Sequence, residues 1–216
     1  MKRYLLTVAM ALALAPVLFS QTQAVVKEFK GKVEIKAGAG DWQQVTVGMK
    51  LDTGASISTG FSSTALLDLG TSTLKVAPLT RMQLVELIAR QGSVSTTLAL
   101  KVGRVNAEVK TAPGLRQDFT LKGPQATAAV RGTEFEFDGV SVKVINGLVS
   151  FSNTQGQSRG VGAGEQSTTN GTALPTSGDQ ENESTTNVQP HTTPGVTTLP
   201  PSAVPPAHAT VTITWQ

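Results

Sequence analysis

The sequence contains no cysteine, only two histidines and few aromatic residues. Without cysteine, disulfide bonds, thiolate nucleophiles and cysteine-ligated zinc sites are excluded. The histidines, His191 and His208, lie in a Thr- and Pro-rich stretch near the end of the sequence, so we expect neither a folded catalytic triad nor a histidine metal site. The composition therefore predicts no cofactor and gives little support to an enzyme.

Long hydrophobic runs are also missing after residue 24, where nothing approaches the ~20 apolar residues that a membrane-spanning helix needs. Before it, Lys2 and Arg3 precede the apolar run Leu5 to Phe19. This pattern is typical of a secretory signal peptide. We expect residues 1–24 to be removed after Ala24, which predicts an exported protein, periplasmic or secreted, without a transmembrane helix.

Charge is modest, with a net charge of +3 for the whole sequence. Residues 25–165 carry a surplus of four positive charges, and the later residues carry only Asp179, Glu181 and Glu183. Basic runs and interleaved aromatic residues, which nucleic-acid binding favours, are absent. We therefore expect no nucleic-acid partner.

Alternation of apolar and polar residues with a period of two dominates residues 27–151, which indicates half-buried β-strands. The alternating segments are Phe29 to Ile35, Ala65 to Leu69, Leu74 to Val76, Met82 to Leu87, Leu98 to Val102, Val105 to Val109, Phe119 to Leu121, Phe135 to Phe137, Val140 to Ile145 and Leu148 to Phe151. Only Leu84 to Arg90 is compatible with a helical turn. The expected fold class is all-β: an antiparallel, hairpin-rich roll or a short solenoid-like stack of sheets, with a β-sandwich as the alternative.

Glycine marks the expected turns, as in Asp138-Gly139 and Asn146-Gly147, which favour tight hairpins. Three tripeptides repeat a glycine before an alternating strand: Gly31-Lys32-Val33, Gly103-Arg104-Val105 and Gly147-Leu148-Val149. Such repetition is consistent with stacked strand units, and ordinary turn chemistry also accounts for it.

Composition changes after Glu165 to Thr, Ser, Pro, Asn and Gly. We expect one β-domain at residues 25–168, a disordered linker at 169–208 and an isolated strand at 209–216. In that last segment Val211, Ile213 and Trp215 alternate with threonines. The strand can pair with a sheet edge of its own domain or with another chain.

Several segments between Gly31 and Thr168 occur in the order and spacing of a known family. They are Gly31 to Val33, Trp42 to Gly48, Leu51 to Gly60, Ala65 to Gly70, Leu74 to Leu84, Gly103 to Val105, Phe119 to Gly123, Ala129 to Phe135, Val142 to Val149 and Gly162 to Glu165. Together they resemble the FecR domain family, an extracytoplasmic β-domain best known from regulators of iron-transport signalling. The family's cytoplasmic segment and membrane helix are not matched, so the resemblance implies the extracytoplasmic module alone.

The segment Val130-Arg131-Gly132-Thr133 is the most telling part of this resemblance. Gly132 permits a bend between two strands that other residues disfavour. Arg131 is expected either to form a local pair with Glu134 or Glu136 across the bend, or to meet a partner. Arg131, Gly132, Thr133 and Glu134 are therefore candidate structural or partner-binding residues.

The segment Asp52-Thr53-Gly54 reproduces the active-site triplet of aspartic proteases. These enzymes need two aspartates that share a proton, and the sequence contains one such triplet. A retropepsin-like dimer would supply the second, with Asp52 as the catalytic residue. The FecR resemblance instead implies a turn at Asp52 and Gly54.

A pair of carboxylates, Glu134 and Glu136, is expected on one face of a strand, ~7 Å apart. This spacing is compatible with a glycosidase, whereas charges alternating with Phe135 and Phe137 are also what an amphipathic strand requires.

Three functional hypotheses follow from the sequence. The first is an exported, non-catalytic FecR-like module that binds an envelope protein in a regulatory role. The second is a surface structural module that binds glycan, and the third is the dimeric aspartic protease.

Overall fold

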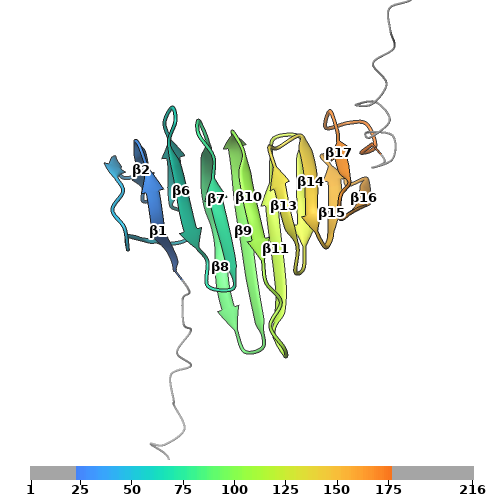
Figure 1. The fold of residues 1–216 in the computed structure, drawn as a ribbon, viewed down its shortest axis with the longest axis horizontal. Helices are drawn as coiled ribbons and strands as arrows, with labels where there is room; N and C mark the ends of the chain where they lie inside the picture. Colours follow the sequence, from blue (N-terminus) through green and yellow to red (C-terminus); the bar gives the residue numbers. More distant parts are fainter. Residues whose placement is uncertain (1–22, 177–216) are drawn as a thin grey trace, which may run out of the picture.

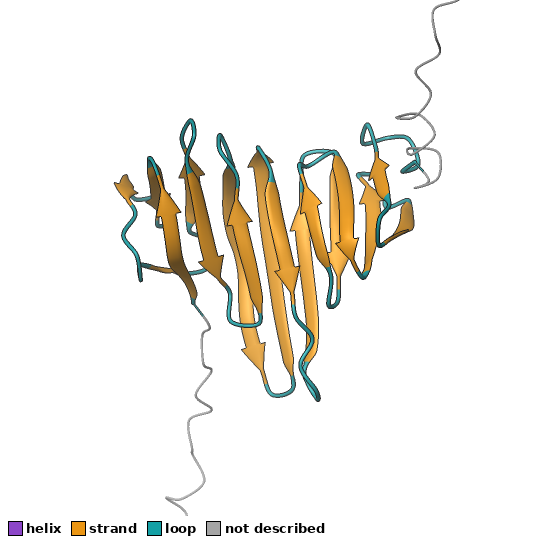
Figure 2. Ribbon diagram, in the orientation of Figure 1, coloured by secondary structure: helices purple, strands orange, loops and turns teal. Residues whose placement is uncertain are grey.

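A computed structural model describes residues 23–176, and every regular element among them is a β-strand (Figure 2). The strands form two sheets that lie face to face (Figure 1). Both sheets are open. The expected fold class, an all-β stack of sheets, is confirmed.

The first sheet has eight strands. In spatial order they are β17 (Gln166–Thr168), β14 (Ser141–Asn146), β13 (Glu134–Phe137), β10 (Val105–Val109), β7 (Ser72–Val76), β6 (Thr64–Asp68), β1 (Ala24–Lys30) and β4 (Lys50–Leu51). All pairs in this sheet are antiparallel.

The second sheet has nine strands. In spatial order they are β16 (Ser158–Gly162), β15 (Leu148–Asn153), β12 (Ala126–Val130), β11 (Arg116–Lys122), β9 (Ser93–Val102), β8 (Arg81–Arg90), β5 (Ser56–Thr59), β2 (Val33–Lys36) and β3 (Trp42–Gln44). The chain crosses repeatedly between the sheets, so consecutive strands often face each other across the core.

One strand pair departs from the antiparallel expectation, because β9 and β11 run parallel. Between them the chain crosses to the first sheet, runs back as β10, and then returns to the second sheet. A parallel pair requires such a crossover connection. A prediction based on hairpin turns does not detect this parallel pair.

The helical turn considered for Leu84 to Arg90 is wrong, because these residues belong to β8. The register of β8 against β9 shifts between Leu84 and Glu86. This bulge inserts one residue, so the buried positions change from Met82 and Leu84 to Leu87. An extra residue disrupts a period of two, and the mixed periodicity of the segment follows from it.

The core lies between the sheets, and aromatic side chains from both sheets contact each other within it. Phe119 of β11 meets Phe135 of β13 edge to face with ring centroids 6.3 Å apart, and Phe137 meets Phe151 of β15 at 6.5 Å. All four side chains are buried. Edge-to-face pairs of this kind add to the stability that apolar burial provides.

Residues 169–176, which the composition assigned to the linker, lie against the last strands. Asn153 Nδ2 donates hydrogen bonds to the carbonyls of Thr172 and Ala173 at 3.3 and 3.0 Å. The amide of Thr176 donates to the carbonyl of Thr168 at 3.0 Å. The packed region therefore extends past residue 168. Most of the expected signal, and the rest of the linker with the C-terminal strand, lie outside the described residues.

Candidate functional site

The three Gly-X-Val repeats form the same local structure. In each, the glycine has a positive φ, and the amide of the next residue donates a hydrogen bond to a Ser or Thr hydroxyl of a neighbouring turn. The amides of Lys32, Arg104 and Leu148 bind the hydroxyls of Ser63, Thr80 and Thr133 at 2.9, 3.0 and 3.3 Å. We call each of these a hydroxyl-clamped corner. The repetition in the sequence therefore has a structural cause.

The third of these corners contains the segment predicted as a bend. Val130 ends β12 in the second sheet, Gly132 has a φ of 68°, and Glu134 begins β13 in the first sheet. Thr133 is buried, and its hydroxyl also donates to the carbonyl of Leu148 at 2.9 Å. The bend thus carries the chain from one sheet to the other, and Thr133 fixes it to β15.

Arg131 pairs with Asp118 of β11, which corrects the expected pairing with Glu134 or Glu136. Its Nε and Nη2 atoms lie 2.9 and 2.7 Å from Asp118 Oδ1. The other carboxylate oxygen accepts a hydrogen bond from Arg116 Nε at 3.2 Å. The pairing follows from the fold, because the side chain of Arg131 extends over the outer face of the second sheet, whereas the two glutamates are on the first sheet.

The two arginines affect the protonation of Asp118. The hydrogen bond from Arg131 is the main cause that lowers the pKa of Asp118 below its ordinary value of 3.8, and desolvation, the next largest influence, opposes it. Charge attraction to Arg131 and Arg116 adds to the lowering. Asp118 is therefore a carboxylate at neutral pH, held between two cations.

A depression of about 390 Å³ lies beside this pair on the outer face of β11, β12 and β15. We call it the Arg131 depression, and its lining residues are Asp118, Phe119, Thr120, Ala129, Val130, Arg131, Leu148 and Ser150. The side chain of Leu148 is 63% exposed here. The depression therefore combines an exposed leucine with a partly exposed ion pair and small polar neighbours.

Glu134 and Glu136 lie on the outer face of the first sheet, as expected for alternate residues of one strand. Glu136 Oε1 lies 3.2 Å from Arg104 Nη1, and its Oε2 accepts a hydrogen bond from Asn106 Nδ2 at 3.1 Å. Glu134 is exposed and stands opposite Glu108 of β10. Glu136 is thus engaged by its own sheet, which is what an amphipathic strand face predicts.

Asp52 is exposed in the turn between β4 and β5. Its Oδ1 accepts a hydrogen bond from Gln23 Nε2 at 2.5 Å. Gly54 has a φ of 90°, and its amide donates to the carbonyl of Leu84 at 2.7 Å. The Asp-Thr-Gly triplet therefore forms a turn that links the two sheets, with its glycine anchored on β8.

Three exposed apolar residues were missed by the sequence analysis. Phe61, Leu79 and Val102 are 83%, 57% and 58% exposed. Phe61 follows Gly60 and Leu79 follows Pro78, both in turns outside the alternating segments, whereas Val102 ends the alternating segment of β9, directly before Gly103. Apolar residues beside turn glycine or proline were the available signal.

Residues 23–176 lack two features. This part of the chain holds no cluster of three or more His, Asp or Glu side chains arranged to bind a metal ion. It also has no helix with the length and apolar character to cross a membrane.

Comparison with known proteins gives one family match. The sequence model of the FecR protein family matches residues 55–150. This range contains Thr133 and every residue that lines the Arg131 depression, and it begins after Asp52. A comparison with curated protein sequences found no match.

Two crystal structures of a candidate anti-sigma factor from Parabacteroides distasonis, at 2.50 and 1.65 Å resolution, are similar to this chain. Each is 17% identical, with TM-scores of 0.47 and 0.46 over 59% and 61% of this chain. The matches span 62% and 65% of those structures, so less than two thirds of their length has a counterpart here.

Proposed function

We propose that this chain is an exported, non-catalytic regulatory module that binds another envelope protein through the Arg131 depression, because residues 55–150 match the sequence model of the FecR protein family. The family is one of regulatory domains, which supports the general role. The choice of the Arg131 depression as the binding surface rests on the geometry around Arg131.

The observation that carries the proposal is the position of Arg131 beside an exposed leucine. Protein interfaces are enriched in arginine, and their buried core is more apolar than the polar rim around it. The side chain of Arg131 is 61% exposed although it is paired with Asp118. Its free donors can therefore bind a carboxylate of a partner while Leu148 is covered.

Asp118 has a defined part in this surface. It holds Arg131 in one position before a partner arrives, which lowers the conformational entropy lost on binding. Arg116 balances the carboxylate from the other side at 3.2 Å. The depression therefore presents an ordered cation.

The absence of cysteine allows a direct test by site-specific crosslinking. Ala129→Cys places a photocrosslinker in the depression, and Lys75→Cys places it on the outer face of the first sheet as the matched control. Both residues are exposed. In envelope extracts of the native host we expect the Ala129 probe to crosslink a distinct protein that the Lys75 probe does not reach.

Two results would count against this function. Equal crosslinking from both positions would show that the Arg131 depression is not the specific binding surface. Recovery of polysaccharide alone would favour the glycan-binding hypothesis instead. Adding Arg131→Ala to the Ala129→Cys variant should reduce the specific crosslink, because the ordered cation is lost.

Export is part of the proposal and has its own test. The sequence predicts cleavage after Ala24, which would place the new amino group on Val25, opposite Lys50 and Asp68 in the register of β1. N-terminal sequencing of protein from the periplasmic or secreted fraction should begin at Val25. Protein that retains residues 1–24 in the cytoplasm would contradict export.

The protease hypothesis is tested through Asp52. We expect no proteolysis at acidic pH at any protein concentration, because the Asp52 turn is a structural connection anchored by Gly54. Activity that pepstatin inhibits and Asp52→Asn abolishes would overturn the non-catalytic role.

A further inference from the structure

Three exposed apolar side chains stand in a row at one end of the molecule. Phe61, Leu79 and Val102 lie at the connections β5–β6, β7–β8 and β9–β10. We call these three residues the corner ridge. Their exposed fractions, 83%, 57% and 58%, are unusual for large apolar side chains that lie near one another.

The row follows from the sheet topology. β6, β7 and β10 are consecutive in the first sheet, and β5, β8 and β9 are consecutive in the second. Connections between them are therefore neighbours, spaced by about 5 Å, the distance between adjacent strands. The amide of Leu79 donates to the carbonyl of Gly60 at 3.2 Å, which joins the first two connections.

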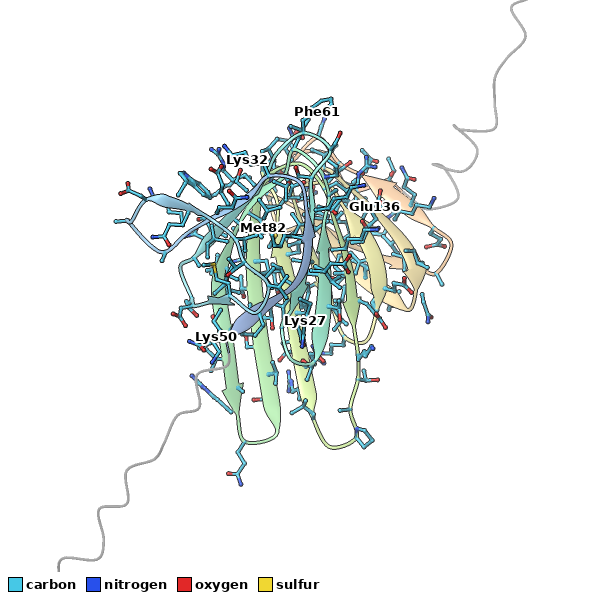
Figure 3. All side chains as sticks on the ribbon, turned by 60° about the vertical axis from the view of Figure 1, so that its left-hand side comes forward. Lys27, Lys32, Lys50, Phe61, Met82 and Glu136 are labelled. Carbon is cyan, nitrogen blue, oxygen red and sulfur yellow. The ribbon has the colours of Figure 1, made fainter. Side chains whose placement is uncertain are left out.

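The corner ridge is at the end opposite the long hairpin of β8 and β9. Figure 3 shows Phe61 at the upper end of the molecule, and Figure 1 shows the β8–β9 hairpin at the lower end. The ridge thus lies at the end of the molecule, and neither sheet extends beyond it.

The backbone of the ridge is held in a conformation that costs free energy. Leu79 has a φ of 54°, and Ser62, next to Phe61, has a φ of 53°. A bulky residue rarely adopts a positive φ, and such strain persists only where surrounding contacts enforce it. Here Thr59 Oγ1 donates to the carbonyl of Ala77 at 2.6 Å and accepts from the amide of Thr80 at 2.9 Å.

Basic residues surround the ridge. The exposed cations on the strand ends beside it are Lys30, Lys32, Lys101, Arg104 and Lys122. Arg81, opposite Val102, is a sixth exposed cation at this end, where four acidic residues also lie: Glu28, Glu34, Glu136 and Asp138. Lys32 pairs with Glu34 and Arg104 with Glu136, and Asp138 accepts hydrogen bonds from the amides of Val140 and Ser141. This end of the molecule therefore has a surplus of positive charge.

We propose that the corner ridge docks on an anionic lipid bilayer, with Phe61, Leu79 and Val102 inserted at the level of the headgroups. Apolar side chains between cations are the combination that binds the interface of an anionic membrane. Lysine stems can lie along the apolar side chains while their ammonium groups meet lipid phosphates. A bilayer can also accommodate the protruding side chains of the ridge, since it deforms around them.

Docking in this way would orient the Arg131 depression. Val105 of β10 lies at the ridge end, next to Arg104, and Val109 lies at the other end, where its amide donates to the carbonyl of Thr133. Membrane contact at the ridge leaves the end with Arg131 directed away from the lipid. The lipid proposal does not depend on the protein partner, because the two surfaces share no residue.

The test compares exported protein with the variant Phe61→Ser/Leu79→Asn by co-sedimentation with lipid vesicles. Asparagine tolerates a positive φ better than most residues, so the fold should be retained, as thermal unfolding can verify. Val47→Thr is the matched control, because Val47 is 65% exposed and lies outside the ridge. All proteins share the remaining sequence, so differences in binding report on the ridge.

We expect binding to vesicles that contain phosphatidylglycerol, weaker binding to phosphatidylcholine vesicles, and a loss of binding as salt rises. The double variant should bind anionic vesicles at least about ten-fold more weakly, whereas Val47→Thr should bind like the parent. Absence of binding to anionic vesicles, or equal binding of the double variant, would overturn the proposal. Crosslinks from a ridge position to a protein but not to lipid would also overturn it.

Discussion

The backbone amide of Arg104 donates a 3.0 Å hydrogen bond to the hydroxyl of Thr80, and that hydroxyl donates to the carbonyl of Arg104 at 3.1 Å. Gly103 precedes this contact and has a φ of 93°. The hydrogen bond from the amide after a glycine to a hydroxyl recurs at Ser63 and Thr133. The Thr133 hydroxyl also donates back to the carbonyl of Leu148, whereas the Ser63 hydroxyl donates to the carbonyl of Phe61. Each corner thus needs both a small residue and a hydroxyl.

Gly103→Ala should destabilise the protein strongly. A Cβ at Gly103 would lie 2.5 Å from the Cα of Thr80 and 2.7 Å from its Cβ. We expect a loss of more than about 3 kcal/mol in the free energy of unfolding, from steric overlap added to the strain of a positive φ. Urea denaturation measures this loss in the free energy of unfolding.

Gly38→Ala is the matched control, since Gly38 also has a positive φ, 53°, but has no atom within 4 Å of the added Cβ. Its cost should be about 1 kcal/mol, from backbone strain alone. Equal losses for the two variants would contradict the close packing of Gly103 on Thr80.

Thr133→Val should also destabilise the protein, by about 1–3 kcal/mol, because it leaves the amide and carbonyl of Leu148 without their buried partner. Valine has nearly the shape of threonine, so packing changes little. Thr127→Val, on the partly exposed face of β12, should change the free energy of unfolding by less than about 0.5 kcal/mol. A neutral Thr133→Val would show that the clamp contributes no stability.

Much of the fold is predictable from the sequence because most strands bury one face, so their apolar residues recur with a period of two. Leu74 and Val76, or Phe135 and Phe137, are examples in which both residues are buried. The bulge at Val85 and the parallel pair of β9 and β11 were not predictable in this way. Both depend on which strands become neighbours, and local periodicity carries no information about that.

The candidate site was predicted in part. Gly132 indicated a bend, and the structure has one there. The predicted pairing of Arg131 with Glu134 or Glu136 was wrong, because it relied on proximity in sequence. The sheet instead brings Asp118 beside Arg131 from thirteen residues away. The corner ridge was missed because Phe61 and Leu79 belong to connections, which the alternation does not describe, and because the alternation gives no sign that Val102, at the end of β9, is exposed.

The ion pair of Asp118 and Arg131 should make a small, pH-dependent contribution to stability. The pKa of Asp118 is lowered in the folded protein, so the contribution is present above the unfolded value, about 3.8, and is lost as the pH falls through the lower folded value. The Asp118 side chain is 44% exposed, so solvent screening keeps the effect within about 1 kcal/mol.

Asp118→Asn isolates this contribution from the titration of other carboxylates. We expect the parent to be slightly more stable than the variant at neutral pH, and the difference to disappear in the acid range below the folded pKa. Carbon NMR titration of the Asp118 carboxyl should report a midpoint below 3.8, the ordinary value. A midpoint above that value would show that Arg131 does not engage Asp118 in solution.

Thr96→Val should be neutral or stabilising, in contrast to Thr133→Val. Thr96 of β9 is buried, and its hydroxyl has no hydrogen-bond partner among the described residues. An unpaired buried hydroxyl costs free energy that an apolar group of the same shape does not. We expect the midpoint of urea denaturation to stay the same or to rise, by an amount equivalent to up to about 1 kcal/mol.

Gln117→Leu provides the contrast for Thr96→Val in the same part of the core. Gln117 Nε2 donates a 2.5 Å hydrogen bond to the hydroxyl of Ser72, which is also buried. Its removal leaves that hydroxyl without its donor but also removes Gln117 Oε1, a buried atom with no hydrogen-bond partner among the described residues. We therefore expect a net loss of about 1 kcal/mol. If Thr96→Val instead proves as costly as Gln117→Leu, the hydroxyl of Thr96 must be hydrogen-bonded in solution. Thr96 would then join Gln117 and Ser72 as a buried polar residue whose hydrogen bond stabilises the fold.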